Sequence, residues 1–194
     1  MSITHNFDRS FDKDKVLFFD MDGTLVDTNY ANFLSYEKAA LTVTKKEYNL
    51  SYIPNQRFNR SLLKNIIPDL SQKEYDKIIL EKEKNYPKLL SETKLIDEVF
   101  EILCKYFKKN KTFLVTNCRK DRALVTLDYH NLTEKFDKIF YRKFYENEAK
   151  INKYQNAISD LGIPPDSIMV FENEESEALD ANNAGIPKNN ILIL

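Results

Sequence analysis

Five short apolar runs recur along the chain, and helix-like stretches separate the last four of them. The runs are residues 15–20 (KVLFFD), 112–116 (TFLVT), 138–141 (KIFY), 168–171 (IMVF) and 191–194 (ILIL). Each is continuously apolar rather than alternating, which is typical of parallel strands covered on both faces. The stretches 121–132, 151–161 and 175–184 read as helices. Alternating strands and helices predict an α/β fold, a Rossmann-like parallel sheet in three layers.

The connection between the first and second apolar runs is far longer than a crossover needs. About ninety residues separate them. They are helical in character over 30–49, 58–67, 71–88 and 93–109, and Ser71 with Glu74 forms a capping box. We therefore predict two domains: an α/β core of residues 1–28 and 91–194, and a small helical domain of residues 29–90 inserted after the first strand.

The composition excludes several classes of function. Gly23, Gly162 and Gly185 are the three glycines of 194 residues, and they stand too far apart for the glycine-rich loops that bind dinucleotides or nucleoside triphosphates. Two histidines are too few for a His-rich metal site. A net charge of −1 gives no electrostatic reason to expect nucleic acid or an anionic membrane as partner.

The same features bear on location. No apolar run approaches the 18 residues of a membrane span, and the first 15 residues lack the apolar stretch of a secretory signal. Two cysteines are too few for a disulfide framework. We therefore expect a cytoplasmic protein, and the sequence leaves its oligomeric state open, a monomer included.

The strongest chemical signal is the string FFDMDGTLVD at residues 18–27. It places Asp20 and Asp22 at i and i+2 where a buried strand ends, so both side chains project from the carboxyl edge of the sheet. Open α/β sheets bind ligands at that edge. Two carboxylates held together are costly unless a cation or a proton compensates them, which indicates a metal and a functional site. Gly23 then lets the backbone turn sharply.

This string resembles the first motif, D-x-D-G-T, of the haloacid dehalogenase superfamily. The resemblance implies a phosphatase in which Asp20 is the nucleophile that forms an aspartyl-phosphate. Asp22 would act first as general acid and then as general base, and Gly23 and Thr24 would contact the substrate. It also implies that the inserted helices form a cap over the site, and the second aspartate favours phosphoryl transfer over halide chemistry.

Two further motifs follow in the order of that family. Thr116 and Asn117 end the second strand, where the resemblance implies that they hold a phosphate oxygen. Lys150, in the segment EAKIN, stands where the family carries a lysine that neutralises the nucleophile and the phosphoryl group. Lys143 and Lys153 are its rivals for this catalytic role.

The fourth motif departs from the family. In FENEESEA, residues 171–178, the usual metal-binding aspartate is replaced by Asn173, while Glu172 and Glu177 remain acidic. Mg²⁺ prefers an octahedral shell of oxygen ligands. The resemblance implies an Mg²⁺ site formed by Asp20, Asp22, Glu172, Asn173 and Glu177. Because Asn173 lacks a charge, we expect weaker metal binding than with aspartate.

The helical insertion brings two arginines into consideration. Arg57 and Arg60 lie in a loop that faces the active site in similar sequences, and a guanidinium suits an anionic or hydroxylated substrate; a role as ordinary surface arginines is equally compatible with the sequence. The sequence thus predicts an Mg²⁺-dependent phosphatase of a small phosphorylated metabolite. Two alternatives stay open: a phosphoglucomutase-like phosphotransferase of the same fold, and, because of Asn173, a catalytically impaired phosphoester-binding or regulatory protein.

Overall fold

The computed structural model describes residues 11–54, 56–143 and 151–194 and shows a five-stranded parallel sheet. The strand order is β5-β4-β1-β6-β7, with bounds β1 (Val16–Phe19), β4 (Lys111–Val115), β5 (Lys138–Phe140), β6 (Ile168–Glu172) and β7 (Ile191–Ile193). All five strands coincide with the five apolar runs. The prediction of an α/β fold with a parallel sheet is confirmed.

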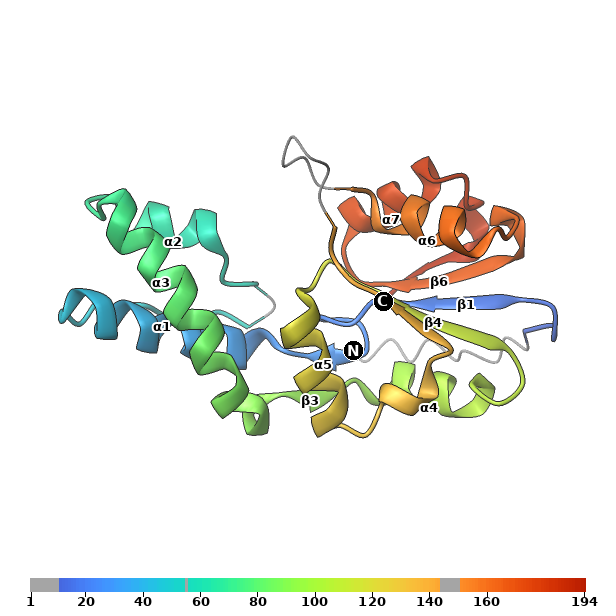
Figure 1. Ribbon diagram of the computed structural model, residues 1–194, viewed down its shortest axis with the longest axis horizontal. Coiled ribbons are helices and arrows are strands. Elements are labelled where there is room, and N and C mark those ends of the chain that lie inside the picture. The colour runs from blue at the N-terminus through green and yellow to red at the C-terminus, as the bar shows by residue number, and fades with distance from the viewer. Residues whose placement is uncertain (1–10, 55, 144–150) are drawn as a thin grey trace, which may run out of the picture.

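Helices cover both faces of this sheet (Figure 1). Along β1, Leu17 and Phe19 pack with α4 (Asp97–Tyr106) and α5 (Lys120–Tyr129), whereas Phe18 packs with α6 (Lys153–Leu161) and α7 (Glu175–Asn183). Successive side chains of a strand point to opposite faces, so β1 needs apolar residues throughout. The continuous apolar run in the sequence follows from this two-sided burial.

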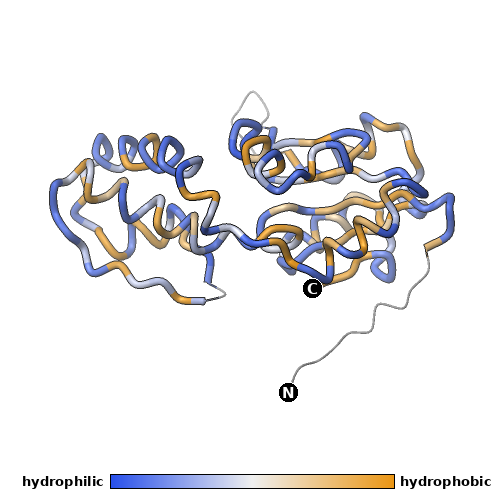
Figure 2. The backbone as a smooth tube through the Cα atoms, turned by 90° about the horizontal axis from the view of Figure 1, so that it is seen from below, coloured by the Kyte–Doolittle hydropathy of each residue, from blue (hydrophilic) through white to orange (hydrophobic). Residues whose placement is uncertain are grey.

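The inserted segment forms a helical body beside the sheet. It contains α1 (Asn29–Thr44), α2 (Arg60–Ile66) and α3 (Gln72–Asn85), followed by the 3₁₀ helix η1 (Tyr86–Glu92). An apolar cluster of its own, built around Phe33, Phe58 and Ile78, holds these helices together. Figure 2 shows this body joined to the sheet by a narrow connection. The predicted capping box at Ser71 and Glu74 is present.

Three of the helices expected in the insertion end or begin elsewhere. The first ends at Thr44 because Lys45 adopts a left-handed backbone (φ 58°). The third ends at Asn85, and the chain continues as η1 with Pro87 in its first turn. The fourth begins only at Asp97, because β3 (Lys94–Leu95) pairs antiparallel with β2 (Val26–Asp27). This two-stranded sheet joins the two chain segments that lead into and out of the insertion.

The remaining short elements are the 3₁₀ helices η2 (Thr133–Lys135), η3 (Pro165–Ser167) and η4 (Lys188–Asn190). They precede β5, β6 and β7. Within the ranges described above, no helix combines the length and the apolar character needed to span a membrane.

Candidate active site

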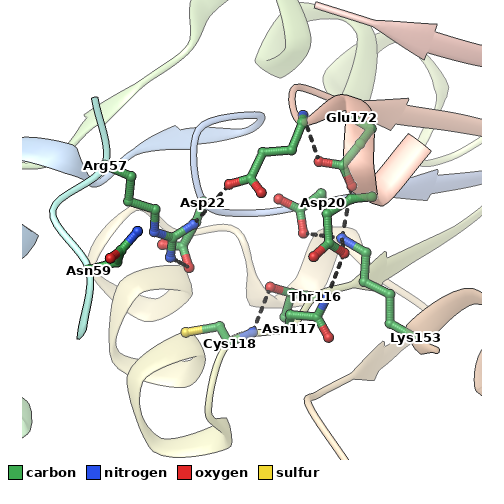
Figure 3. A pocket seen from close by; sticks show the side chains of 11 residues that line it. Asp20, Asp22, Arg57, Asn59, Thr116, Asn117, Cys118, Lys153 and Glu172 are labelled. Carbon is green, nitrogen blue, oxygen red and sulfur yellow. Dashed lines mark hydrogen bonds and ion pairs between the residues drawn. The ribbon is translucent and has the colours of Figure 1, made fainter. Parts of the chain in front are cut away.

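The turn after β1 places two aspartates at the carboxyl edge of the sheet. Asp20 and Asp22 are both buried, and both line a cavity of about 290 Å³ (Figure 3). The amides of residues 24–26 all point at the carbonyl of Met21, at 2.9–3.4 Å, so the chain is wound tightly around one acceptor. The amide of Asp20 donates to the carbonyl of Phe171 (3.1 Å), which ties the turn to β6. The two carboxylates are therefore held by backbone geometry.

Gly23 is required in this turn for two reasons. Its φ of +87° lies in a region that side-chain-bearing residues rarely adopt. A Cβ atom built on it would also lie 2.5 Å from Nδ2 of Asn173. The glycine thus lets the first and fourth motifs approach each other, and Thr24 next to it donates a hydrogen bond to Oδ1 of Asn173 (3.0 Å).

One buried lysine joins the carboxylates of three chain segments. The Nζ atom of Lys153 lies 2.7 Å from Oδ1 of Asp20, 2.8 Å from Oε2 of Glu172 and 3.3 Å from Oε2 of Glu177. Its side chain is only 2% exposed, so the ammonium group is shielded from solvent and faces three carboxylates. These carboxylates raise the pKa of Lys153 well above its usual range against the opposing effect of burial. The lysine is therefore charged at neutral pH.

Lys150, which the sequence analysis placed in this role, lies outside the described residues. Lys143, one of its two rivals, extends its Nζ atom to Oδ1 of Asn156 (3.1 Å) instead of to the site. The lysine beside Asp20 is the other rival, Lys153. A sequence signal for it exists: Asn is a preferred N-cap residue, and the Asn152 side chain accepts hydrogen bonds from the amides of residues 154 and 155. Lys153 is consequently the first residue of α6.

The two aspartates have opposite electrostatic environments. Burial and the neighbouring Glu172 raise the pKa of Asp20 to about 7, although Lys153 opposes this. Burial would also raise the pKa of Asp22, but the guanidinium groups of Arg122 and Arg57 outweigh it and hold that pKa well below its usual range. Two carboxyl groups with pKa values pushed apart are a common feature of sites that perform acid–base chemistry.

Asp22 is held by three side chains. Nη2 of Arg122 lies 2.8 Å from its Oδ1, Nη2 of Arg57 lies 3.0 Å from its Oδ2, and the hydroxyl of Thr28 donates to Oδ1 at 2.6 Å. Arg57 comes from the helical body and also approaches Glu174 (3.6 Å). Arg57 is among the residues predicted from the sequence, whereas Arg122, in the first turn of α5, is not. Its guanidinium stacks on the Tyr86 ring at 4.3 Å.

The second motif lies at the end of β4 beside these aspartates. Thr116 is buried, and its hydroxyl accepts a hydrogen bond from the amide of Cys118 (3.1 Å). Asn117 donates to Oε2 of Glu177 (2.5 Å). Both residues line the 290 Å³ cavity with Asp20, as Figure 3 shows. The structure thus brings the second motif to the first.

Cys118 lines the same cavity but is not a reactive thiol. Burial raises the pKa of Cys118 to about 12, and the thiolate is the reactive form of cysteine. We expect a disulfide reagent at pH 8 to modify Cys104, which is exposed, at least about tenfold faster than Cys118. Mass spectrometry of timed, trypsin-digested samples measures both rates; equal rates would contradict the burial of Cys118.

The fourth motif is already engaged in hydrogen bonds. Oε1 of Glu172 accepts from the amides of residues 173 and 174, and Oε2 accepts from Lys153 and from the Tyr154 hydroxyl. Oδ1 of Asn173 accepts from Thr24. Across residues 11–54, 56–143 and 151–194, no three acidic, histidine or cysteine side chains are grouped as metal ligands.

These contacts test how well the site fits Mg²⁺. Asp20, Glu172 and Glu177 carry more negative charge than Lys153 neutralises, which favours a further cation. Few carboxylate oxygens are available to bind a metal, however. Glu172 accepts hydrogen bonds from four protein groups, and Glu177 is paired with Lys153 and Asn117. Asp20, the main-chain carbonyl of Asp22 and the neutral oxygen of Asn173 are oxygen ligands of the kind that Mg²⁺ prefers; Asn173 Oδ1 also accepts from Thr24, and Glu172 and Glu177 would first have to leave their partners.

Comparison with known proteins identifies the family. The family model described as haloacid dehalogenase-like hydrolase matches residues 17–190, which include all four motifs. The chain belongs to the haloacid dehalogenase-like hydrolases. The family resemblance drawn from the sequence is confirmed, and with it the expectation of an enzyme.

Relatives of this haloacid dehalogenase-like hydrolase cover most of its length. It is 25% identical to a phosphorylated carbohydrates phosphatase of Thermotoga maritima over 90% of this chain and 83% of the relative. A subfamily IA, variant 1, hydrolase of Geobacter sulfurreducens has the same fold, with a TM-score of 0.67 at 18% identity over 92% and 86% of the two chains. A family IA, variant 3, hydrolase of Entamoeba histolytica gives a TM-score of 0.65 at 24% identity over 88% and 81%.

Proposed function

We propose that this protein is a phosphatase of a small phosphorylated metabolite and works through an aspartyl-phosphate on Asp20. One observation carries the proposal: Asp20 is buried, contacts Lys153 and lines a cavity that Asp22 and Thr116 also line. The family and the phosphatase relative support this chemistry.

In the first step, an oxygen of Asp20 attacks phosphorus, and the bond between phosphorus and the ester oxygen breaks. The leaving oxygen takes a proton from Asp22. In the second step, water gives its proton to Asp22 and attacks phosphorus, which releases phosphate and restores Asp20. Lys153 neutralises the attacking carboxylate and the phosphoryl oxygens throughout.

The arrangement of Asp22 bears directly on these steps. Between Arg122 and Arg57 it is ionised, which suits its role as base in the second step. Its role as acid in the first step requires a higher pKa; departure of Arg57 would raise the pKa of Asp22, while Arg122 and Thr28 would still lower it. Because Arg57 belongs to the segment between α1 and α2, movement of the helical body relative to the sheet would change the protonation of Asp22. We propose that residues 29–90 act as a cap in this sense.

We further propose that Mg²⁺ assists the reaction. Asp20, the carbonyl of Asp22 and Asn173 would hold the ion, which would offset negative charge where the phosphoryl group binds. Asn173 contributes a neutral oxygen, so the site should be weak.

The Asn173→Asp variant is expected to bind Mg²⁺ about tenfold or more tightly than wild type, because it adds a negative charge to a ligand position. Titration calorimetry with Mg²⁺ and the Mg²⁺ dependence of phosphate release measure the change. Asn189→Asp adds the same charge at an exposed position beyond β6 and should change neither. Unchanged affinity in Asn173→Asp would remove residue 173 from the metal site.

The test of the function is a screen of phosphomonoesters with and without Mg²⁺, with inorganic phosphate as the product measured. Release of phosphate from at least one ester supports the phosphatase. Activity that appears only after a bisphosphate activator is added favours the phosphotransferase. The missing charge at Asn173 is the reason to test for a third outcome. If no ester is turned over, even by Asn173→Asp, the protein is an impaired, phosphoester-binding one.

A further inference from the structure

A second cavity adjoins the one that contains Asp20, and its charge is opposite. The cavity has a volume of about 160 Å³ and shares five lining residues with its neighbour: Asp22, Arg57, Asn59, Asn117 and Cys118. The first cavity is lined by five carboxylates and two cationic side chains, whereas the second is lined by two carboxylates and six cationic side chains. The cations of the second cavity are Arg57, Arg60, Lys82, Arg119, Arg122 and Arg142.

The arginines of this chain are concentrated here. The sequence contains 23 lysines and six arginines. All five arginines within the described ranges line this one cavity, whereas Lys82 alone among the described lysines does so. The planar guanidinium binds carboxylate and phosphate groups through two parallel hydrogen bonds, which an ammonium cannot do. In a chain that otherwise uses lysine, this gathering of arginine indicates an anion site.

The cluster comes from both bodies of the molecule. Arg57 and Arg60 belong to the segment that begins α2, and Lys82 belongs to α3. Arg119 and Arg122 lie at the start of α5. An anion in the cavity would therefore contact the helical body and the sheet together.

The cations are close enough to disfavour one another. Burial and the charges of Arg60 and Arg119 lower the pKa of Arg142. Burial and the charge of Arg122 lower the pKa of Lys82 to about 8. Lys82 is 3% exposed and lies within 3.2 Å of Glu83, one of the two carboxylates that line the cavity. An anionic ligand would offset this repulsion at Arg142 and Lys82, whereas Arg57, Arg119 and Arg122 already have carboxylate partners in Asp22 and Asp121.

Arg122 also has a donor that the protein leaves unused. The side chain is about nine-tenths buried, and its Nη2 atom binds Asp22. Its Nε atom is buried and has no hydrogen-bond partner among the described residues. Buried donors without partners are rare and costly in folded proteins, and Arg122 is one of the residues that line this cavity.

We infer that the substrate carries a second anionic group, a carboxylate or a second phosphate, which this arginine-lined cavity binds while the reacting phosphoryl group lies at Asp20. The inference rests on the proposed function and narrows its substrate class to small phosphomonoesters that carry a second anionic group. The two cavities together are at the small end of the range of about 300–1,000 Å³ for small-molecule sites.

Binding to the non-turnover variant Asp20→Asn tests the inference without relying on catalysis. Calorimetry compares two matched pairs of ligands: fructose 1,6-bisphosphate with fructose 6-phosphate, and 3-phosphoglycerate with glycerol 3-phosphate. In at least one pair, we expect the member with two anionic groups to bind about tenfold tighter or more than the member with one phosphate alone. The pair with the larger ratio distinguishes a second phosphate from a carboxylate.

Arginine variants in the same background assign the preference to the cavity. Arg60→Gln and Arg142→Gln should each reduce the ratio about fivefold or more, because they remove a charge from the cavity, while Arg60→Lys should retain part of it. Lys188→Gln removes an exposed charge ahead of β7 and should leave the ratio unchanged. Each variant is first checked for native circular dichroism.

Equal affinities within both pairs, or a ratio that Arg60→Gln and Arg142→Gln leave intact, would overturn the inference. If wild type hydrolyses the esters with one anionic group and those with two at equal kcat/KM, the phosphatase stands and the second anion site does not. If no ester is hydrolysed but the binding ratio and its loss in the arginine variants are found, the anion site stands and the phosphatase does not.

Discussion

Replacing Asp20 by asparagine is expected to lower the rate of phosphate release by about 10⁴-fold or more, the usual effect of removing a nucleophile. An amide oxygen does not attack phosphorus as a carboxylate does, and no other described carboxylate is both in contact with Lys153 and two residues from Asp22. The loss should appear in kcat, because the reaction stops before the covalent step. Rapid-quench measurement with a ³²P-labelled ester should show labelled protein in wild type and none in the variant.

A matched control separates this effect from damage to the fold. Asp160→Asn makes the same change on the outer part of α6, where the Asp160 side chain is 37% exposed and pairs with Lys138. Its activity should stay within about twofold of wild type, as usual for surface changes. If Asp20→Asn retained wild-type activity, Asp20 would not be the nucleophile.

Replacing Lys153 by methionine is expected to destabilise the protein by about 3–5 kcal/mol at pH 8, because it leaves buried carboxylates without their cation. The loss should shrink at pH 5. Burial and Glu172 raise the pKa of Asp20 in the folded state to about 7, and loss of Lys153 removes the charge that opposes this rise. The folded state then binds more protons, and stability is retained at low pH but lost as pH rises through the folded-state pKa of Asp20.

Urea unfolding in EDTA at pH 5, 6.5 and 8 measures this difference, and EDTA removes any contribution from a bound metal. Lys111→Met is the control, because it breaks an exposed ion pair with Asp137, which should contribute about 0–1 kcal/mol at any pH. A loss in Lys153→Met that is the same at pH 5 and pH 8 would show that packing of the lysine stem, rather than its charge, dominates.

The sheet and the first motif could be predicted from the sequence because both depend on local pattern. A strand buried on two faces must be apolar throughout, as Leu17, Phe18 and Phe19 are, so its position can be read directly. A tight turn that needs a positive φ leaves a glycine behind, as at Gly23. Parallel topology then brings the end of β4, with Thr116, to the same edge.

The parts that could not be predicted depend on contacts between distant residues. Arg122 contacts Asp22 one hundred positions earlier in the chain, and nothing near Arg122 in the sequence indicates this. The two-residue strand β3 is too short to leave a pattern, and the apolar spacing around it predicts a helix instead. The choice among three lysines depended on where α6 begins, which Asn152 decides by capping the helix.

The two-stranded sheet of β2 and β3 has a consequence for how this enzyme can be altered. Val26 pairs with Leu95 and Asp27 pairs with Lys94, so the points where the chain departs from the sheet and returns to it lie side by side. A two-residue hairpin turn is enough to close such an antiparallel pair. The helical segment thus leaves the sheet and returns to it at one place. A different insert grafted between Asp27 and Lys94 would replace Arg57, Arg60 and Lys82 together, and to keep the site it would have to supply the contacts that Thr28 makes with Asp22 and Tyr86 makes with Arg122.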